Sequence, residues 1–533
     1  METQTPTTLT PAEHSQFDSL QQKLISLWTS IGRTDPGGPL EDHNTVVVVP
    51  SMSVDSDNMA GAALQAYEER FLFMLFLLRQ PNLRLIYVTA QAIQPATIDY
   101  YLQLLPGLSI SNARKRLFLV SPLDGSARTL TQKLLERPRT IRHIRALIPD
   151  LDRAHLVPYN TTDPEKELAI RLGIPMYAAD PDFFAFGTKS GGRRMFAEEG
   201  LPHPLGVENL RSVEDLVTAI AQMRAAQSPA PSVDAEGTPQ HHAPEMRRVI
   251  VKLNEGVSGE GNAVVNIEGL PPSGDPRERA EITERLHGMR FELAGISFDW
   301  YAHKLEERGG IVEEMIEGEQ FTSPSTQLRV SPLGGVEQLS THDQMLGGPS
   351  GQSYLGCRFP ANAEYAPAIM REAAKIGRRF AKEGIVGRFA IDFVAVRGKD
   401  GAWRVYAIEI NLRKGGTTHP FLTLQYLTDG SYDPERAVFK TQRGDEKCYV
   451  ATDHLHSEAY RTFTADDLFD IVSRHRLHFN HASQTGIVLH MVSGVGELGQ
   501  LGFTAIGDTH ESANALYNRM VEVLDIEARN ALQ

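Results

Sequence analysis

The sequence predicts a mixed α/β (α+β) protein of about three domains. The chain has 533 residues, and domains commonly hold about 100–200 residues each. Residues 44–160 alternate short β-branched apolar runs with helical segments, which is typical of a parallel sheet covered by helices. Residues 248–413 instead alternate apolar and polar positions between hairpin turns, and this pattern indicates antiparallel strands.

Composition and charge are those of an ordinary globular protein. Hydrophobic residues make up 41% of the chain and charged residues 23%, so a packed core is expected. The formal net charge of −14 argues against nucleic-acid binding, which requires a basic surface. A nucleotide is still compatible with this charge, because a local cluster can oppose the global sign. The longest apolar run, residues 71–78, is too short for a membrane helix of about 20 residues.

Cysteine usage and the N-terminus predict a cytoplasmic protein. Cys357 and Cys448 are too few for a disulfide framework or a CxxC zinc site, and a reducing compartment is the natural environment for such a chain. The first residues contain neither the basic nor the apolar segment of a signal peptide.

The first domain is predicted from its strands in order. Residues 1–43 form a polar tail with one amphipathic helix over residues 17–31. A long helix is expected over residues 58–79, after the first strand. Residues 44–185 are therefore assigned to a Rossmann-like α/β domain, with buried strands at residues 45–53, 83–90, 116–122 and 154–160.

Two further domains follow. The second covers residues 186–425 and contains a stretch rich in Pro, Ala and Ser, residues 226–245, which is expected to be a disordered loop. Residues 426–533 combine helices with a strand hairpin and are assigned to a small α+β C-terminal domain.

The most informative segment is a predicted strand near residue 410. Glu409, Asn411 and Arg413 occupy alternate positions in a run whose other positions are mostly apolar. Because alternate side chains of a strand point to opposite faces, one face suits a core. The other face carries a carboxylate, an amide and a guanidinium in a row.

A predicted hairpin gives this row a partner. Asp400 and Gly401 would form a two-residue turn, which places Asp392 opposite Glu409. Facing carboxylates lie about 5 Å apart and repel unless a cation lies between them. A hard divalent ion, Mg²⁺ above all, prefers such oxygen ligands. The competing interpretation is a solvated sheet face with surface ion pairs, and a register slip of one residue would separate the carboxylates.

The same turn would place Arg388 opposite Arg413. Two guanidiniums beside a metal indicate an anion there, either a phosphate or a carboxylate.

These residues resemble a known family. Asp392, followed by "EINLR" and "THP", resembles the C-terminal half of the ATP-grasp fold. The resemblance implies that Asp392, Glu409 and Asn411 hold Mg²⁺, or Mn²⁺, on the phosphates of ATP. It also implies that Arg413 binds the carboxyl substrate and its acylphosphate, with Arg388 as a weaker candidate.

The other motifs of this family occur upstream in the required order. "FGTKSGG" resembles the segment of a first phosphate-binding lysine, Lys189, and "IVKLNEGVSGEGN" that of a second, Lys252. Glycines in the second motif let the backbone approach phosphates; these are Gly256, Gly259 and Gly261.

"GGIVEEMIEGEQFT" resembles the hinge that reads adenine. The resemblance implies that Glu313 accepts a hydrogen bond from the adenine amino group. The backbone of Met315 and Ile316 would pair with the ring, and Glu314 beside them is counted in the nucleotide site. Glu319 or Gln320 would lie near the ribose.

A narrower resemblance covers most of the chain. Residues 61–107, 340–361 and 486–517 resemble the pheganomycin-type peptide ligases, which have a pre-ATP-grasp domain, an ATP-grasp domain and a C-terminal domain. The implied activity is an ATP-dependent carboxylate–amine ligation through an acylphosphate. Its reactants are a small carboxylate donor and an amine or peptide acceptor, and a homodimer is left open.

Two other functions compete with this one. A carboxylase or an acyl–thiol ligase would use the same fold, but no biotinyl- or CoA-type partner domain is evident in the sequence. A nucleotide-binding protein without catalysis is the third hypothesis, although Asp392, Glu409, Asn411 and Arg413 are all retained.

Overall fold

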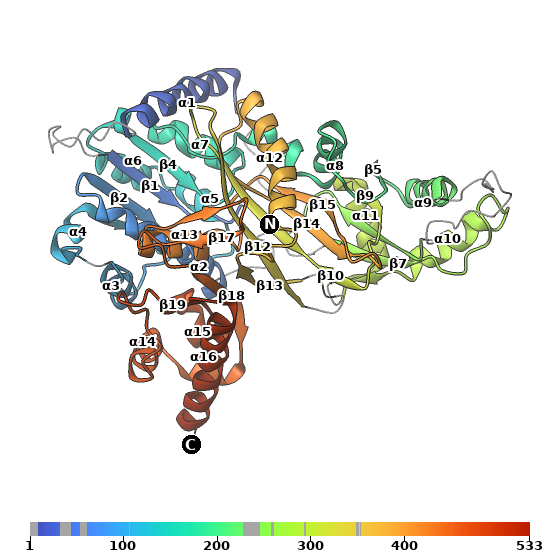
Figure 1. Cartoon of the computed structure of the whole chain (residues 1–533). Helices are drawn as coiled ribbons and strands as arrows, with labels where there is room; N and C mark the ends of the chain where they lie inside the picture. The colour runs from blue at the N-terminus through green and yellow to red at the C-terminus, as the bar shows by residue number, and fades with distance from the viewer. Residues whose placement is uncertain are drawn as a thin grey trace.

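The computed structural model describes residues 9–31, 44–53, 61–105, 107–227, 246–256, 261–292, 295–347, 351 and 353–532. Figure 1 shows an N-terminal α/β part, a central sheet in yellow and orange, a green part at one end, and a C-terminal part in red. Most of the loop predicted to be disordered, residues 228–245, lies outside the described residues. None of the helices in the described ranges has the length and apolarity that a membrane crossing requires.

The N-terminal part contains the predicted parallel sheet. Its strand order is β3-β2-β1-β4, and all neighbours run parallel. The residues of β1 are buried because helices cover both faces of the sheet. Each predicted strand is confirmed: β1 (Asn44–Val49), β2 (Leu83–Val88), β3 (Leu117–Val120) and β4 (Ala154–Pro158). The helices α1 (Pro11–Ile31), α3 (Pro95–Gln103), α4 (Ile110–Arg116), α5 (Leu130–Leu135), α6 (Pro138–Ala146) and α7 (Asp163–Leu172) surround it.

The predicted long helix after β1 is broken in the structure. It consists of α2 (Ala62–Glu69) and a 3₁₀ helix, η1 (Leu72–Arg79), and its first residues lie outside the described ranges. At the break, the Ser493 N–H donates to the Glu69 carboxylate at 3.2 Å, and Arg70 pairs with Asp453. The break was hidden in the sequence because η1 is almost wholly buried and has no polar face to give a period.

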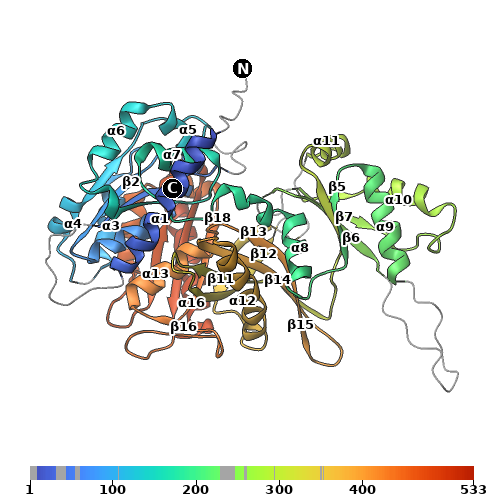
Figure 2. The same cartoon turned by 90° about the horizontal axis from the view of Figure 1, so that it is seen from above.

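A second, antiparallel sheet forms the green part. Its strand order is β5-β9-β6-β7-β8, and helices pack on it around an apolar core. Figure 2 shows this part set to one side of the molecule. Its elements are β5 (Gly206–Leu210), α9 (Val213–Gln227), β6 (Arg248–Leu253), β7 (Asn262–Asn266), α10 (Glu278–His287), β8 (Arg290–Phe291), α11 (Phe298–Arg308) and β9 (Gly310–Glu314). The helix α8 (Lys189–Glu198) precedes it.

The central sheet is antiparallel and includes strands from the C-terminal segment. Its order is β10-β14-β11-β12-β13-β18-β20-β19, with β15 beside β14. Helix α12 (Ala366–Glu383) packs against β11 and β12. The strands are β10 (Gln320–Thr322), β11 (Pro324–Val330), β12 (Val336–Gly347), β13 (Ser353–Phe359), β14 (Gly387–Arg397), β15 (Trp403–Asn411), β18 (Cys448–His456), β19 (Gly486–His490) and β20 (Gln500–Gly507).

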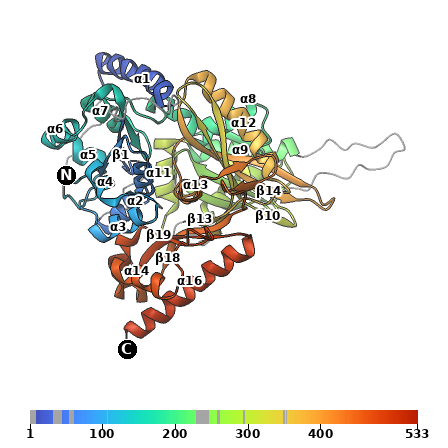
Figure 3. The same cartoon turned by 60° about the vertical axis from the view of Figure 1, so that its left-hand side comes forward.

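The C-terminal segment therefore continues the central sheet through β18, β20 and β19. Figure 3 shows α16 crossing beside these strands. The remaining elements are α13 (Thr418–Thr428), β16 (Ser431–Asp433), β17 (Val438–Lys440), α14 (Ala465–Arg474), α15 (Val495–Leu498) and α16 (His510–Ala531), with the 3₁₀ turns η2 (Leu151–Arg153), η3 (Pro181–Gly187), η4 (Glu458–Thr462) and η5 (Val492–Gly494).

The β14–β15 hairpin corrects the predicted turn and keeps the predicted pairing. The Gly398 N–H donates to the Ala402 carbonyl at 3.0 Å, so the loop is one residue longer than predicted, with Gly401 at a φ of 77°. A register shift next to Asp392 then compensates for the longer loop. As a result, Asp392 lies opposite Glu409 as predicted, although the two-residue turn that predicted it was wrong.

Candidate active site

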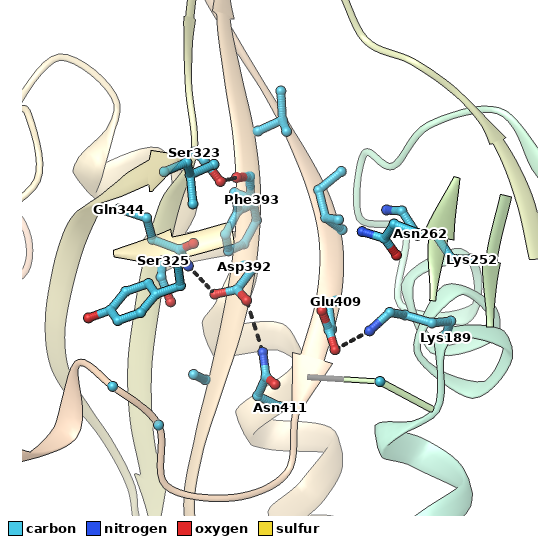
Figure 4. Close-up of a pocket in the computed structure, with 18 of the residues that line it drawn as sticks. Lys189, Lys252, Asn262, Ser323, Ser325, Gln344, Asp392, Phe393, Glu409 and Asn411 are labelled. Atoms are coloured by element: carbon cyan, nitrogen blue, oxygen red, sulfur yellow. Dashed lines mark hydrogen bonds and ion pairs between the residues drawn. The ribbon is translucent and has the colours of Figure 1, made fainter. Parts of the chain in front are cut away.

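A cavity of about 480 Å³ is lined by residues of the N-terminal part, the green part and the central sheet. Figure 4 shows one side of it, where lysines from the green part face the strands that carry Asp392 and Glu409. Most of the predicted site residues line this cavity: Lys189, Lys252, Gly256, Glu313, Glu314, Met315, Ile316, Asp392, Glu409, Asn411 and Arg413.

Lys189 reaches the cavity from the first turn of α8. The Thr188 hydroxyl caps this helix by accepting from the Gly191 N–H at 3.0 Å. Gly191 has to be glycine, because an added Cβ would lie 1.8 Å from the Ala185 carbonyl oxygen. Helix α8 packs against β15, and the buried ammonium of Lys189 pairs with Glu409. The glycines after Lys189 thus serve close packing, which brings the lysine to the acidic strand.

The acidic pair forms a small polar network. The Asn411 Nδ2 donates to Asp392 Oδ2 at 2.9 Å, and the Gln344 Nε2 donates to Asp392 Oδ1 at 2.8 Å. Ser325 is the register neighbour of Asp392 on β11. Burial, and then the charge of Glu409, raises the pKa of Asp392 to about 6. Two carboxylates held together in this way are stabilised by a cation.

These residues fit a magnesium ion that is bound together with phosphates. Asp392, Glu409 and Asn411 offer side-chain oxygens, which are the ligands a hard divalent ion prefers. Among the described residues, no group of three His, Cys, Asp or Glu side chains is arranged to hold a metal. The protein would therefore supply only part of a coordination shell, and phosphate oxygens and water would complete it.

The second lysine belongs to a buried ionic triad. Lys252 on β6 pairs with Glu313 on β9, and the Arg193 Nη1 donates to the other Glu313 oxygen at 3.0 Å. All three side chains are buried. Because both Glu313 oxygens are engaged, a contact to an adenine amino group would share an oxygen with one of these cations.

The hinge after β9 presents main-chain groups to the cavity. The Glu314 N–H donates to the Leu205 carbonyl at 2.8 Å, and the Met315 N–H donates to the Arg248 carbonyl at 3.0 Å. Within the described residues, the Ile316 N–H has no main-chain partner. Of the three hinge residues that line the cavity, Ile316 is therefore the one whose N–H has no main-chain acceptor.

Of the predicted residues that the structure describes, four do not line the cavity: Glu319, Gln320, Gly261 and Arg388. Glu319 and Gln320 are exposed beyond the hinge. Gly261 is not among the residues that line the cavity, and its carbonyl accepts from the Tyr301 hydroxyl at 2.7 Å. Gly259 falls outside the described residues. Arg388 lies opposite Arg329 on β11.

Arg413 and Arg388 occupy different places, contrary to the predicted facing pair. Strand β15 ends at Asn411, which pairs with Ala390, so no position of β15 lies opposite Arg388. Burial, and then the charge of Arg329, lowers the pKa of Arg388 to about 10. The Arg413 guanidinium instead lines the cavity. In the described part of the chain its one hydrogen bond is a contact of 3.2 Å to the Lys414 carbonyl.

Several lining residues were not predicted from the sequence. Gln344 and Ser325 belong to neighbouring strands of the sheet, and sheet register would have revealed them had the strand order been known. The wall away from the hinge has no such local signal, because distant segments supply it: Met52, Tyr67, Arg70, Tyr159, Tyr354 and His454.

Comparisons with known proteins agree with this geometry. Residues 296–435 match the family described as IQCH-like, ATP-grasp, and residues 467–520 match the PGM1 C-terminal domain. The chain is 29% identical over 463 residues to an L-propargylglycine–L-glutamate ligase of Streptantibioticus cattleyicolor, covering 86% of this chain and 88% of that protein. It is 25% identical over 443 residues to the IQ motif-containing protein H of Danio rerio, covering 74% of this chain and 39% of that protein.

A solved structure supports the fold. A biotin carboxylase in a β,γ-ATP complex from Campylobacter jejuni has a TM-score of 0.51 at 11% identity, over 92% of this chain and 95% of that chain. The order of the motifs around the cavity agrees with these matches, which make the chain similar to ATP-grasp proteins and to a ligase. Within this class, most of its length is similar to an enzyme whose name specifies two amino acids.

Proposed function

We propose that the protein is an ATP-dependent carboxylate–amine ligase that joins two small molecules by an amide bond. The observation that carries this proposal is the convergence of Lys189, Glu409 and Arg413 on one cavity. Activation of a carboxylate requires a cation, a carboxylate that can hold a metal, and a free guanidinium face. Lys189 and Glu409 form an ion pair here, and Arg413 has a single hydrogen bond within the described residues.

The chemistry follows from the poor reactivity of a carboxylate toward amines. A carboxylate oxygen of the donor attacks the γ-phosphorus of ATP, which forms an acylphosphate and releases ADP. The amine nitrogen of the acceptor then attacks the acyl carbon, the C–O bond to phosphate breaks, and the amine loses one proton. Such phosphoryl transfer depends mainly on positioning and on neutralisation of charge.

The chain's residues divide these tasks. We assign the phosphates to Lys189, Lys252 and the Gly256 backbone, which line the same cavity. Asp392, Glu409 and Asn411 would hold Mg²⁺, which neutralises phosphate charge when bound. Arg413 would orient the donor carboxylate by a bidentate contact.

The nucleotide base is assigned to the hinge. The Ile316 N–H is the unbonded main-chain donor there within the described ranges, and Ile250, Val394 and Ile408 supply apolar walls. The adenine contact of Glu313 and the ribose contact of Glu319 or Gln320 stay predictions.

The substrates are proposed to be amino acids. The name of the 29% identical relative specifies L-propargylglycine and L-glutamate, and that likeness supports the same chemical class here. A carboxylase is the second enzymatic candidate, since the biotin carboxylase shares the fold.

The test is ADP release from Mg-ATP with single amino acids and with pairs, beginning with L-glutamate and L-propargylglycine. ADP that appears only with a pair, together with a product of the condensed mass, establishes a ligase. ADP that depends on bicarbonate and one amine would favour a carboxylase. Binding of ATP without turnover under any condition would favour a nucleotide-binding protein. Arg413→Ala serves as the inactive control.

A further inference from the structure

The wall of the cavity opposite the hinge is built from three segments that are far apart in the sequence. Tyr67 and Arg70 come from the end of α2, Tyr354 from β13 and His454 from β18. Figure 1 shows α2 beside β18, so the N-terminal and C-terminal parts meet at this wall. A cavity wall at such a junction is a common place for a ligand to be selected.

Arg70 is the charged group of this wall. Its side chain is 5% exposed and pairs with Asp453, which is 1% exposed. Its guanidinium also lies over the ring of Tyr67, 4.7 Å from the centroid. In the described part of the chain, Asp453 is the one hydrogen-bond partner of this guanidinium, and Nε has none. Since guanidinium has five donors, Arg70 retains capacity for a second carboxylate.

Structural stability alone gives little reason for a buried pair here. Desolvation of two charges can exceed their attraction, and apolar replacements of such pairs are often neutral or stabilising. The pair lies beside a large apolar core that contains Phe71 and Tyr159, which apolar side chains would extend. Its place on a cavity wall therefore points to binding.

The aromatic residues around Arg70 leave a defined space. Tyr354 packs against Gly416, where an added Cβ would lie 2.6 Å from the tyrosine Cε1, so this ring is fixed on the wall. Tyr67, Tyr159 and Met52 line the cavity near the same junction. These surfaces suit a compact apolar group next to a carboxylate.

We propose that Arg70, held by Asp453, binds the carboxylate that does not react, so that one substrate is an α-amino acid with a free α-carboxylate. This inference rests on the proposed ligase function, in which Arg413 binds the carboxylate that does react. The two guanidiniums would then separate the two roles of carboxylates within a single cavity.

The test removes both charges of the pair so that neither is left buried alone. The variant Arg70→Met/Asp453→Leu is compared with wild type by calorimetric binding of L-glutamate, L-propargylglycine and L-alanine. Each amino acid is compared with its α-carboxamide, in the presence of Mg²⁺ and a non-hydrolysable ATP analogue. For at least one of them, wild type is expected to prefer the carboxylate by about 30- to 100-fold, and the variant by less than about 3-fold.

A second buried pair provides a matched control. Arg224 and Glu278 form a buried ion pair on α9 and α10 and do not line the cavity. Arg224→Met/Glu278→Leu should retain the wild-type preference. The single variant Arg70→Lys, which keeps the charge and loses the fork, should lie between wild type and the double variant.

Binding and turnover distinguish the two proposals. If the folded double variant binds the ATP analogue normally and still prefers the carboxylate, the role of Arg70 is overturned while ligase activity can stand. If wild type binds no amino acid more tightly than its carboxamide, the role of Arg70 is overturned as well. If the double variant loses the preference for the carboxylate and Arg224→Met/Glu278→Leu keeps it, the role of Arg70 is supported. This conclusion holds even if ADP release shows a reaction other than ligation.

Discussion

The two halves of the cavity solve different electrostatic problems. In the half that faces the hinge, each carboxylate is paired with a cation or an amide, as Glu409 is with Lys189 and Asp392 with Asn411. In the opposite half, one neutral Arg70–Asp453 pair lies among aromatic rings. The first half can exchange its internal pairs for phosphates and a metal, whereas the second can add a ligand without giving up its pair.

This difference indicates that the half facing the hinge determines the reaction and that the opposite half determines which amino acid is bound. Positioning of phosphates and a metal requires charge at fixed spacing, which one hairpin and two lysines provide. Recognition of a particular carboxylate requires shape, which only the meeting of separate segments provides. Substitutions in the first half should therefore change turnover or the KM for ATP, and those in the second should change the KM of an amino acid.

The largest effect is expected from Glu409→Gln. This change removes a proposed metal ligand and the partner of Lys189, so kcat should fall by at least about 10³-fold, as lost electrostatic stabilisation of several kcal/mol implies. ADP release measures it, with the exposed Glu364→Gln as control. If turnover falls less than tenfold, the acidic strand does not carry the reaction.

A smaller loss is expected from Arg413→Lys. The ammonium keeps the charge but cannot hold a carboxylate in a bidentate manner, so kcat/KM for the donor should fall by about 10²-fold. Arg404→Lys, at an exposed position of the same hairpin, should leave it unchanged. An equal loss in both variants would mean that the strand, and not the guanidinium, is responsible.

Lys252→Met should act on ATP alone. The change removes one charge-assisted contact to phosphate, so the KM for ATP should rise by about 30-fold while the KM values of the amino acids stay constant. Steady-state kinetics with each reactant varied in turn separate these constants. A rise in an amino-acid KM would show that Lys252 also affects amino-acid binding, which would contradict the division of the cavity into two halves. Lys304→Met, on α11 outside the cavity, is the control.

The sequence predicted the first half better than the second for physical reasons. Strand alternation placed Glu409 and Asn411 on one face, and the Asp392–Glu409 pairing survived a wrong turn because a register shift compensated for the longer loop. Arg388 was misplaced because the end of a strand is not visible in alternation. Arg70 was missed because the contacts at the break in its helix come from distant residues: Asp453 lies 383 positions after Arg70, and Ser493 lies 424 positions after Glu69.

The buried pair of histidines His419 and His490 should make the stability of the protein sensitive to acid. The Nε2 atoms of His419 and His490 lie 3.0 Å apart in a buried site, and burial lowers the pKa of His490 to about 4 and lowers that of His419. Unfolded histidine titrates near pH 6.5, so the unfolded state binds more protons between about pH 6.5 and 4. The stability due to neutral His490 is therefore fully present above pH 6.5 and falls as the pH drops toward 4.

His490→Gln removes one titrating group and keeps a polar side chain. Between pH 7 and pH 5, the variant should lose about 1.5 kcal/mol less unfolding free energy than wild type, as measured by urea denaturation at each pH. His303→Gln, at an exposed position of α11, should lose as much as wild type. If the unfolding free energy of His490→Gln falls with pH as steeply as that of wild type, another group is responsible for the acid sensitivity. If the wild-type KM for an amino acid also rises at pH 5, the histidine pair affects the half of the cavity that binds the amino acid.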